Sequence, residues 1–264
     1  MFSHISRRNL ILKQVEVFRP PIFKTNDSFW NRFVNLMRRF RDLQAISIWM
    51  DLAQELPKVY GAVLDIGCGA QTYRMLMPEN ISYLGLDTED AKLNFGYEVP
   101  GTLYFSGEDW PVGEASFDFV LCAEVLEHIP DPRSFVQQAA KCLKPGGGLL
   151  LTVPFSARWH FIPHDYWRFT PSGLNLLLLD AGFDSIVVHA RGNPLTVACY
   201  KVMALPLILI FNADKRVLSK VFNRTLGVLL IPLLLLVGVV ANLTIKLDWG
   251  DDCLGYTVIA KRKA

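Results

Sequence analysis

The chain has 264 residues, of which 51% are hydrophobic, and its formal net charge is +2. This length and composition suffice for one substantial α/β core with residues to spare. So small a net charge excludes the broad basic surface typical of nucleic-acid binding, and we expect no nucleic-acid partner. The five cysteines are widely separated and form no CxxC pair, which favours a reducing, cytosolic compartment. Lys13 and Glu16 interrupt the apolar residues near the start, so we expect no signal peptide.

The N-terminal segment, residues 1–56, is expected to be an arm followed by helices. Residues 1–26 lack a helical period and contain the helix breakers Pro20 and Pro21. Between 29 and 56, apolar residues recur at helical spacing with arginines between them. These apolar residues are Phe29, Phe33, Leu36, Phe40, Leu43 and Ile46. We expect one or two helices that cover the start of a sheet.

From residue 57 to 191 the sequence alternates short strand-like runs with helical segments. The strand-like runs are 61–66, 81–86, 102–106, 117–122, 147–153 and 184–190, and the clearest helical segments are 131–143 and 171–181. This alternation predicts a doubly wound α/β domain with parallel strands and right-handed crossovers. Ligands of such a sheet bind at the carboxyl ends of its strands.

A glycine-rich turn follows the first strand-like run. Residues 63–70 read VLDIGCGA, and Asp87 ends the next run twenty positions after Gly67, a spacing at which an acidic side chain holds the ribose of a nucleoside cofactor. A dinucleotide fingerprint would need glycine where Thr72 stands, and Asp65 would put negative charge beside a pyrophosphate. S-adenosylmethionine has no phosphate, and Asp65 can attract its ammonium and sulfonium groups. We expect this methyl donor, with a nicotinamide cofactor as the alternative.

Four segments, in order along the chain, carry a resemblance to a known family. They are VLDIGCGA at 63–70, YLGLD at 83–87, SFDFVLCAEVLEHIPDP at 116–132 and LKPGGGLLLTVPF at 143–155. Together they resemble the class I S-adenosylmethionine-dependent methyltransferases of the type 11-like group, over about 60–191 and a strand-like run at 253–261. The resemblance implies a Rossmann-like, mostly parallel seven-stranded sheet with an antiparallel last strand.

The resemblance also implies which residues hold the donor. Asp65 and the two glycines after it would lie against the methionine end, and Asp87 would accept hydrogen bonds from the ribose hydroxyls. The expected donor-binding residues are Asp65, Gly67, Cys68, Gly69, Asp87, Ser106, Gly107, Glu108 and Glu124. Two features depart from the family pattern: Gln71 stands in place of a third glycine, and Ser106 and Gly107 stand where many members present an acidic residue to adenine.

Ionisable side chains follow the fourth strand-like run, in the segment CAEVLEHIP. Glu124 is expected beside the donor, and His128 follows about one helical turn later. Because imidazole titrates near neutral pH, His128 is a candidate general base; the alternative is that it packs against or caps a helix. The segment also resembles some RNA 2′-O-methyltransferases that hold a divalent metal with two glutamates and a histidine. Glu124, Glu127 and His128 would match that set if a further histidine joined them, but we expect no metal.

The loop after the fifth strand-like run reads PFSARWHFIPHDYWRFT and is rich in aromatic and ionisable residues. It lies beyond the carboxyl end of a strand, where acceptor substrates approach, and it resembles the corresponding loop of bacterial methyltransferases of polysaccharide and lipid biosynthesis. His164 is a second candidate base, so the expected catalytic residues are Glu124, His128 and His164, and either His160 or His164 would complete the alternative metal site. The structural alternative is a clamp in which Asp165 or Tyr166 pairs with Arg168.

Residues 192–250 break the alternation and are expected to form a hydrophobic helical hairpin inserted before the last strand. Leu195–Phe211 is apolar apart from Thr196 and Lys201, and residues 226–245 contain no charge, which meets the length of a bilayer span. The strands before and after the insert must lie in one compartment. The insert therefore enters and leaves a membrane from the same side, and crossing would carry its basic turn across as well.

We accordingly expect a monotopic or re-entrant hairpin at residues 195–245, associated with the cytoplasmic side of the membrane through apolar contacts and anionic headgroups. Pro206 and Pro232 would kink its helices. The alternative is a buried helical hairpin or a dimer interface. The membrane interpretation favours an acceptor that is lipidic or lipid-linked.

The sequence as a whole predicts a methyltransferase domain at 57–191 and 251–264, interrupted by the insert at 192–250. Its expected reaction is methyl transfer from S-adenosylmethionine to a small-molecule, lipid or lipid-linked glycan acceptor at the membrane surface, with catalysis mainly by positioning. Two rival functions are a nicotinamide-dependent oxidoreductase and a catalytically silent, membrane-tethered donor-binding module.

Overall fold

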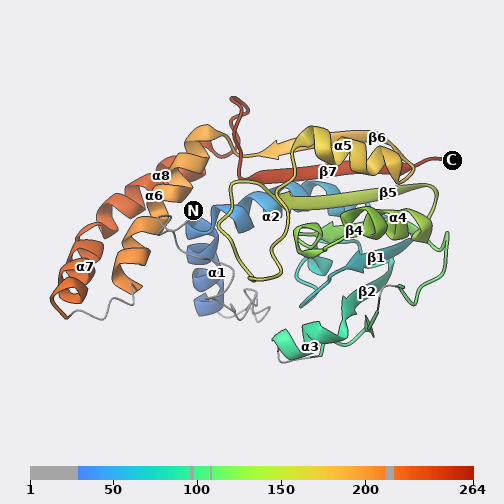
Figure 1. The fold of residues 1–264 in the computed structure, drawn as a ribbon, viewed down its shortest axis with the longest axis horizontal. Coiled ribbons are helices and arrows are strands. Elements are labelled where there is room, and N and C mark those ends of the chain that lie inside the picture. The colour runs from blue at the N-terminus through green and yellow to red at the C-terminus, as the bar shows by residue number, and fades with distance from the viewer. Residues whose placement is uncertain (1–28, 96–97, 108, 212–216) are drawn as a thin grey trace, which may run out of the picture.

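A computed structural model describes residues 29–95, 98–107, 109–211 and 217–264. The arm expected at 1–26 lies outside these residues, as does Glu108. At the centre is a seven-stranded sheet with the order β3-β2-β1-β4-β5-β7-β6 (Figure 1). Its strands are β1 (Ala62–Ile66), β2 (Ser82–Thr88), β3 (Thr102–Phe105), β4 (Phe117–Ala123), β5 (Leu143–Pro154), β6 (Phe183–Arg191) and β7 (Gly255–Arg262).

The strand directions confirm the predicted fold class. β1 pairs in parallel with β2 and β4, and the parallel pairing extends to β3 and β5. Only β7 is antiparallel, to β5 on one side and to β6 on the other. The carboxyl ends of β1, β2, β4, β5 and β6 therefore lie along one edge of the sheet, where β7 begins.

Helices cover both faces of the sheet because apolar residues point alternately to the two sides of each strand. Leu149 and Leu151 of β5 belong to the core beneath α4 (Pro132–Cys142) and α5 (Pro171–Asp180), whereas Leu150 belongs to the core beneath α2 (Leu43–Glu55). A short helix, α3 (Glu89–Phe95), follows β2. Side chains cap α2, α4 and α5: Thr170 Oγ1, for example, accepts from Gly173 N at 3.2 Å at the start of α5.

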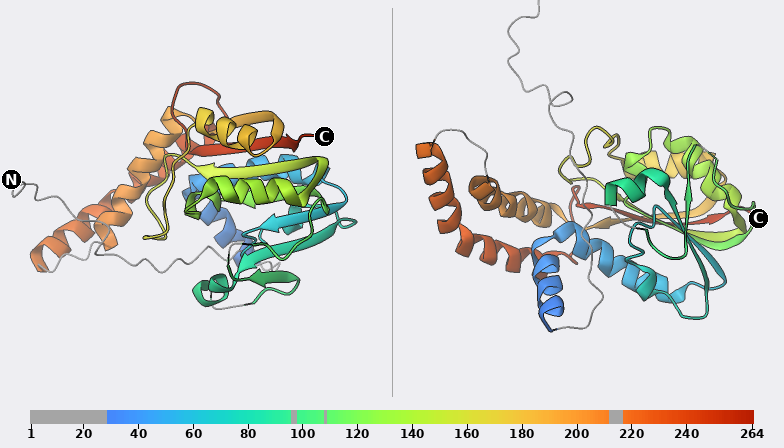
Figure 2. Two further views of the ribbon diagram at one scale, coloured as in Figure 1. Left: turned by 45° about the vertical axis from the view of Figure 1, so that its right-hand side comes forward. Right: turned by 90° about the horizontal axis from the view of Figure 1, so that it is seen from below.

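The two N-terminal helices lie in different places relative to the sheet. α2 covers the sheet as predicted, but α1 (Phe29–Arg41) projects beside α2 toward the inserted helices (Figure 2). Phe29 and Trp30 are about three-quarters exposed. Of the one or two helices expected to cover the sheet, the structure therefore has one, α2. The contact of α1 with the insert is made near its end, where the carbonyl of Phe40 accepts from Asn242 Nδ2 at 3.0 Å.

The insert consists of three helices that lie between β6 and β7 and project from the sheet (Figures 1 and 2). They are α6 (Pro194–Phe211), α7 (Val217–Leu229) and α8 (Ile231–Thr244). The sequence predicts two helical stretches, 195–211 and 226–245, with a basic turn between them. The turn is wrong from residue 217 onward, because α7 begins there, and Leu230 separates α7 from α8. Pro232 stands in the first turn of α8, where its missing N–H costs nothing.

Hydrogen bonds and apolar packing hold the base of the insert against the domain. Asn193 Nδ2 donates to the carbonyls of Thr244 and Leu247 at 2.7 and 2.9 Å, and Asn193 Oδ1 caps α6 at Thr196 N. Met203 and Ala241 are buried together with Leu43 of α2 in a third hydrophobic cluster. The two ends of the insert are thus held together next to the end of β6.

Within the part of the chain that the structure describes, none of the helices alone has both the length and the apolar composition to cross a membrane. Residues 221–229 and 231–244 satisfy both criteria only together, and a 45° bend separates them.

Candidate active site

The glycine turn after β1 is built by main-chain geometry. Gly67 has φ +67°, and a Cβ there would collide with the side chain of Val125. Its amide donates to the carbonyl of Leu86 at 2.8 Å, and the amide of Gly69 donates to Asp87 Oδ2 at 2.8 Å. The acidic residue at the end of β2 thus fixes the turn as well as facing the cleft beside it. Burial raises the pKa of Asp87, against hydrogen bonds from Gly69 and Thr88 that lower it.

A cleft of about 390 Å³ opens beside this turn and has the shape and chemistry of a nucleoside site. Three of the residues that the sequence assigns to the donor, Gly67, Asp87 and Gly107, line it. The rest of its wall is largely apolar and comes from Leu86, Phe105, Trp110, Val125, Ile129 and Phe135. Trp110 packs edge-to-face on Phe135 with ring centroids 5.1 Å apart. An apolar wall and a carboxylate in one cleft suit a base and a ribose.

Asp65 and Cys68 lie beneath the turn and do not line the cleft. Asp65 is 3% exposed, and its Oδ2 accepts from the Tyr83 hydroxyl at 2.7 Å. Burial, opposed by that hydrogen bond and aided by the charge of Asp87, raises the pKa of Asp65 to about 7. Cys68 is buried beside Thr102, and burial raises the pKa of its thiol. Ser106 is exposed and lies outside the cleft lining.

At the end of β4, Glu124 has φ +56°, an unusual conformation for a residue with a side chain. Its Oε1 accepts from Nη2 of Arg191 at 2.8 Å. Arg191 is fully buried at the end of β6 and also donates to the carbonyl of Val153 at 2.9 Å. A Cβ at Gly255, the first residue of β7, would collide with this guanidinium, so glycine there leaves room for it. Strands β4, β5 and β6 are joined by this one side chain.

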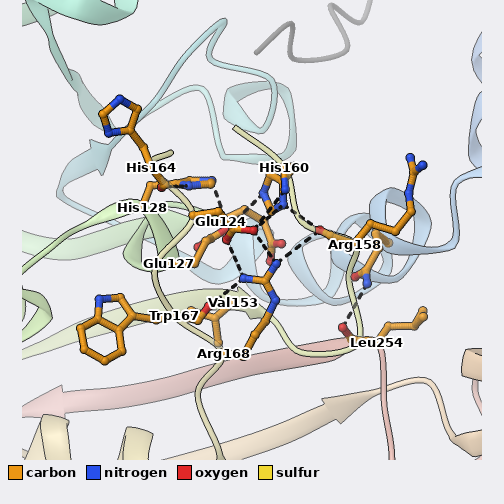
Figure 3. A network of polar contacts seen from close by, with 12 residues as sticks. Glu124, Glu127, His128, Val153, Arg158, His160, His164, Trp167, Arg168 and Leu254 are labelled. Atoms are coloured by element: carbon orange, nitrogen blue, oxygen red, sulfur yellow. Dashed lines mark hydrogen bonds and ion pairs between the residues drawn. The ribbon is translucent and has the colours of Figure 1, made fainter. Parts of the chain in front are cut away.

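Glu127 and His128 lie in a short 3-10 helix, η3 (Leu126–His128), directly after Glu124. The Glu127 side chain is completely buried, and burial, with Glu124 next, raises its pKa well above the ordinary value. His160 comes from the loop after β5 and packs edge-to-face on His128 with ring centroids 4.8 Å apart. Burial lowers the pKa of His128, which favours the neutral imidazole that a general base requires. Figure 3 shows these side chains converging.

The loop after β5 is clamped as the structural alternative predicts. Asp165 accepts from Arg168 Nη1 and Nη2 at 2.6 and 2.8 Å, and from the amide of His160 at 3.1 Å. Burial would raise the pKa of Asp165, but the hydrogen bonds from Arg168 prevail and the pKa is lowered. The amides of Tyr166 and Trp167 donate to the carbonyl of Glu127 and hold the loop over η3.

The two histidines proposed as bases lie in different surroundings. His128 Nδ1 binds the carbonyl of His164 at 2.8 Å, so the loop backbone positions the imidazole of His128. The ring of His164 itself is exposed, turns away from Glu127 and contacts the Tyr166 hydroxyl at 3.2 Å (Figure 3). The structure therefore brings Glu124, Glu127, His128 and His160 together and leaves the side chain of His164 at the rim.

Two residues that shape the site were not predicted. Trp110 lies in an irregular segment after β3, and only its aromatic character among polar neighbours could have marked it. Arg191 is a lone basic residue at the end of a strand-like run, a position that faces the ligand edge of the sheet. That placement is the signal by which it could have been found.

The fold and the cleft define a nucleoside-binding protein of the Rossmann-like class, and comparison with known proteins gives the family. The model of the methyltransferase domain family matches residues 37–188, more than half of the chain. The chain belongs to this family, and its methyl donor is S-adenosylmethionine. The predicted class I methyltransferase and its donor are confirmed, and the nicotinamide alternative is set aside.

Curated relatives and solved structures agree with this assignment. The chain is 34% identical over 125 residues to the ubiquinone biosynthesis O-methyltransferase of Xanthomonas oryzae pv. oryzae, covering 42% of this chain and 48% of that protein. It is 32% identical over 165 residues to the protein of the same name from Psychrobacter arcticus, covering 51% and 63%. The chain thus spans about half to just under two thirds of the length of these relatives.

Two solved structures share the fold. A SAM-dependent methyltransferase from Archaeoglobus fulgidus gives a TM-score of 0.51 at 16% identity, over 87% of this chain and 99% of that one. A methyltransferase from Thermotoga maritima, described as a possible histamine N-methyltransferase, gives a TM-score of 0.50 at 17% identity, over 88% and 97%. Identities this low show the fold and leave the acceptor open.

Proposed function

We propose that this protein transfers the methyl group of S-adenosylmethionine to a hydroxyl oxygen of a lipid or lipid-linked acceptor at the cytoplasmic surface of a membrane. The names of the curated relatives support oxygen as the acceptor atom. The neutral His128, positioned by the loop after β5 beside Glu127, supports a reaction in which a hydroxyl loses its proton. Glu124 contributes by holding Arg191 where β4, β5 and β6 meet.

The observation that carries the membrane part of the proposal is the apolar surface of α7 and α8. A helix on the surface of a soluble domain presents polar residues to water, yet the exposed side of α8 consists largely of leucine and valine. Exposed apolar residues of these two helices include Val221, Phe222, Val228, Leu229, Leu233, Leu235, Leu236, Val239 and Leu243. A surface of this kind marks an interaction site. Exposed aromatic residues of α1, the helix that contacts α8, extend this apolar surface.

The place of the insert relative to the site supports an acceptor drawn from the bilayer. The insert leaves the sheet directly after Arg191, the residue that binds Glu124. A cleft of about 320 Å³ lies next to Arg191 and is bordered by Ser47 of α2 and by Ile245 at the end of α8. An acceptor bound at the base of the insert is therefore close to the edge where the donor binds. Anionic headgroups would also attract the four basic residues that the sequence has between α6 and α8, which are Lys215, Arg216, Lys220 and Arg224.

The test is to incubate the full-length protein with methyl-labelled S-adenosylmethionine and, in parallel, with membranes, a soluble metabolite extract and total RNA. We expect label in the organic phase of the membrane sample, in a product that mass spectrometry identifies as an O-methyl ether. Label confined to the soluble extract or to RNA would overturn the lipid acceptor. Tight binding of S-adenosylhomocysteine without label in any extract would favour the silent donor-binding module.

Membrane association is tested separately with vesicles that contain anionic phospholipid. The double variant Phe222→Glu, Leu236→Glu places charge on two side chains that are 67% and 62% exposed. We expect it to lose most vesicle co-sedimentation, because burying a carboxylate in the bilayer is costly. The matched control is Leu176→Glu on α5, at a leucine that is 59% exposed and far from the insert. Equal co-sedimentation of the double variant and the wild type would contradict the proposal.

A further inference from the structure

Lys201 is the only charged residue in the sequence of α6, a helix that is otherwise almost wholly apolar. A charge in a helix of this composition is costly wherever the helix meets a bilayer, so its presence calls for a reason. Lys201 Nζ donates to the carbonyl of Ser156 at 2.5 Å. Ser156 is the second residue after β5 and stands at the start of the loop that lies over η3. The one cation of α6 thus joins the insert to the active-site loop.

The segment that returns from the insert holds the same part of the loop. Ser156 Oγ donates to Asp252 Oδ1 at 2.8 Å. The amides of Phe155 and Ser156 donate to the carbonyl of Leu254 at 2.8 and 3.0 Å. Asp252 and Leu254 lie between the end of α8 and the start of β7. Contacts from both ends of the insert therefore fix the start of the loop.

Apolar packing joins the insert and this anchor point. Leu254 is fully buried in the cluster that contains Cys199 and Met203 of α6 and Ala241 of α8. Close-packed interiors of this kind transmit strain. A change in the motion of α6 and α8 therefore reaches the first residues of the loop.

The far end of the loop is attached to the active site. The amides of Tyr166 and Trp167 donate to the carbonyl of Glu127 at 2.9 and 3.3 Å. Between the two anchor points, the ring of His160 packs on the ring of His128. None of the loop residues 155–170 lines the donor cleft. The position of the loop thus affects the acceptor side of the site and leaves the donor side unchanged.

We propose that Lys201 is a positioning residue that ties the loop after β5 to the insert, and that an insert bound to a membrane thereby steadies the loop over the active site. The tie depends only on the contacts above, whereas the effect of the membrane rests on the proposed function. Binding to a bilayer restricts the motion of α6–α8, and the loop that is attached to them loses freedom as well. The acceptor side of the site is then held in place at the membrane and more loosely away from it.

Hydrogen–deuterium exchange of the loop amides measures this tie and needs no acceptor. The amides of Ser156 and His160 are hydrogen-bonded, so their exchange reports how often the loop opens. In the full-length protein without vesicles, Lys201→Met should speed this exchange by roughly three- to tenfold, because a hydrogen bond from a charged donor is lost. Lys201→Arg keeps a long cationic donor and should restore slow exchange. The matched control, Lys246→Met, removes the same charge from an exposed lysine just beyond α8 and should exchange as the wild type does.

The effect of the membrane is measured by adding vesicles of phosphatidylglycerol and phosphatidylcholine in equal parts. We expect exchange of the same amides to slow at least about twofold in the wild type and in Lys201→Arg, because the bound insert restricts the loop. Lys201→Met should co-sediment with the vesicles and yet show no such slowing. Direct shielding of the loop by lipid would persist in this variant, so the comparison separates shielding from coupling through the insert.

The inference is overturned if Lys201→Met exchanges as the wild type does without vesicles, or if Lys246→Met opens the loop equally. Lys201 is exposed, so Lys201→Met should keep the wild-type melting temperature and affinity for S-adenosylhomocysteine. A loss of both would reveal a general folding defect and would also overturn the positioning role. If the wild type co-sediments and its loop exchange does not change, the membrane effect fails while membrane association stands. If the wild type does not co-sediment and Lys201→Met still opens the loop, the tie stands and the membrane part of the proposed function fails.

Discussion

Donor binding should release protons from Asp65. This carboxyl lies beneath the glycine turn with a pKa of about 7, so it is about half protonated at pH 7 when no donor is bound. The ammonium and sulfonium of S-adenosylmethionine favour its ionised form. If the pKa falls well below 6 in the complex, each donor bound releases about 0.9 proton at pH 6, about 0.5 at pH 7 and about 0.1 at pH 8.

Calorimetry in buffers of different ionisation enthalpy measures this release, because the observed heat varies with the buffer in proportion to the protons exchanged. Two comparisons isolate Asp65. The Asp65→Asn variant removes the titrating group and keeps an oxygen that can accept from Tyr83. Methylthioadenosine keeps the nucleoside but lacks the charged amino-acid end. Equal proton release in the variant and the wild type, or with methylthioadenosine and the full donor, would refute the view that Asp65 senses the donor's positive charge.

Three further substitutions test the site. Gly67→Ala should weaken S-adenosylhomocysteine binding at least about tenfold in calorimetric titrations, because its Cβ collides with the side chain of Val125. The control is Gly101→Ala: Gly101 also has a positive φ, but a Cβ there has open space. Comparing the two variants separates backbone strain from crowding. Arg191→Met should lower the free energy of unfolding by about 2–4 kcal/mol in urea titrations, since it leaves Glu124 without its buried partner. The control is Lys58→Met, which breaks the exposed ion pair with Glu55 and should cost less than about 1 kcal/mol. Equal losses of stability in the two variants would contradict the argument. Trp110→Ala should weaken S-adenosylhomocysteine roughly tenfold with little change in melting temperature, and unchanged affinity would remove this side chain from the cleft wall.

Local patterns made the sheet and its helices predictable. Strand-like runs bounded by glycine and proline give the strands, and the contact of Asp165 with Arg168 spans only three residues. The interaction of Arg191 with Glu124 joins positions 67 residues apart and depends on β6 lying beyond β7 in the sheet. Sequence spacing alone does not contain that order.

The same limit applies to the cluster of Glu127, His128 and His160. Glu127 and His128 are neighbours in the chain, so their proximity is trivial. His160 joins them only because amides of the loop donate to the carbonyl of Glu127 and fold the loop over η3. The sequence offered two histidines for this place, and nothing in their spacing distinguishes His160 from His164. The choice is made by the clamp at Asp165, which accepts from the amide of His160 and fixes which ring turns inward.

The position of the insert follows from the directions of the strands. β6 is antiparallel to β7, and β7 is antiparallel to β5, so the end of β6 and the start of β7 both lie at the edge where β1, β2 and β4 also end. Any segment inserted between β6 and β7 must leave and return at that edge. If α6–α8 bind a membrane, the donor cleft and the cluster around Glu127 necessarily lie at the edge from which the insert reaches the bilayer. An insert between β4 and β5 would begin at this edge but return at the opposite one. The β6–β7 connection that this chain uses instead returns its insert to the edge of the active site.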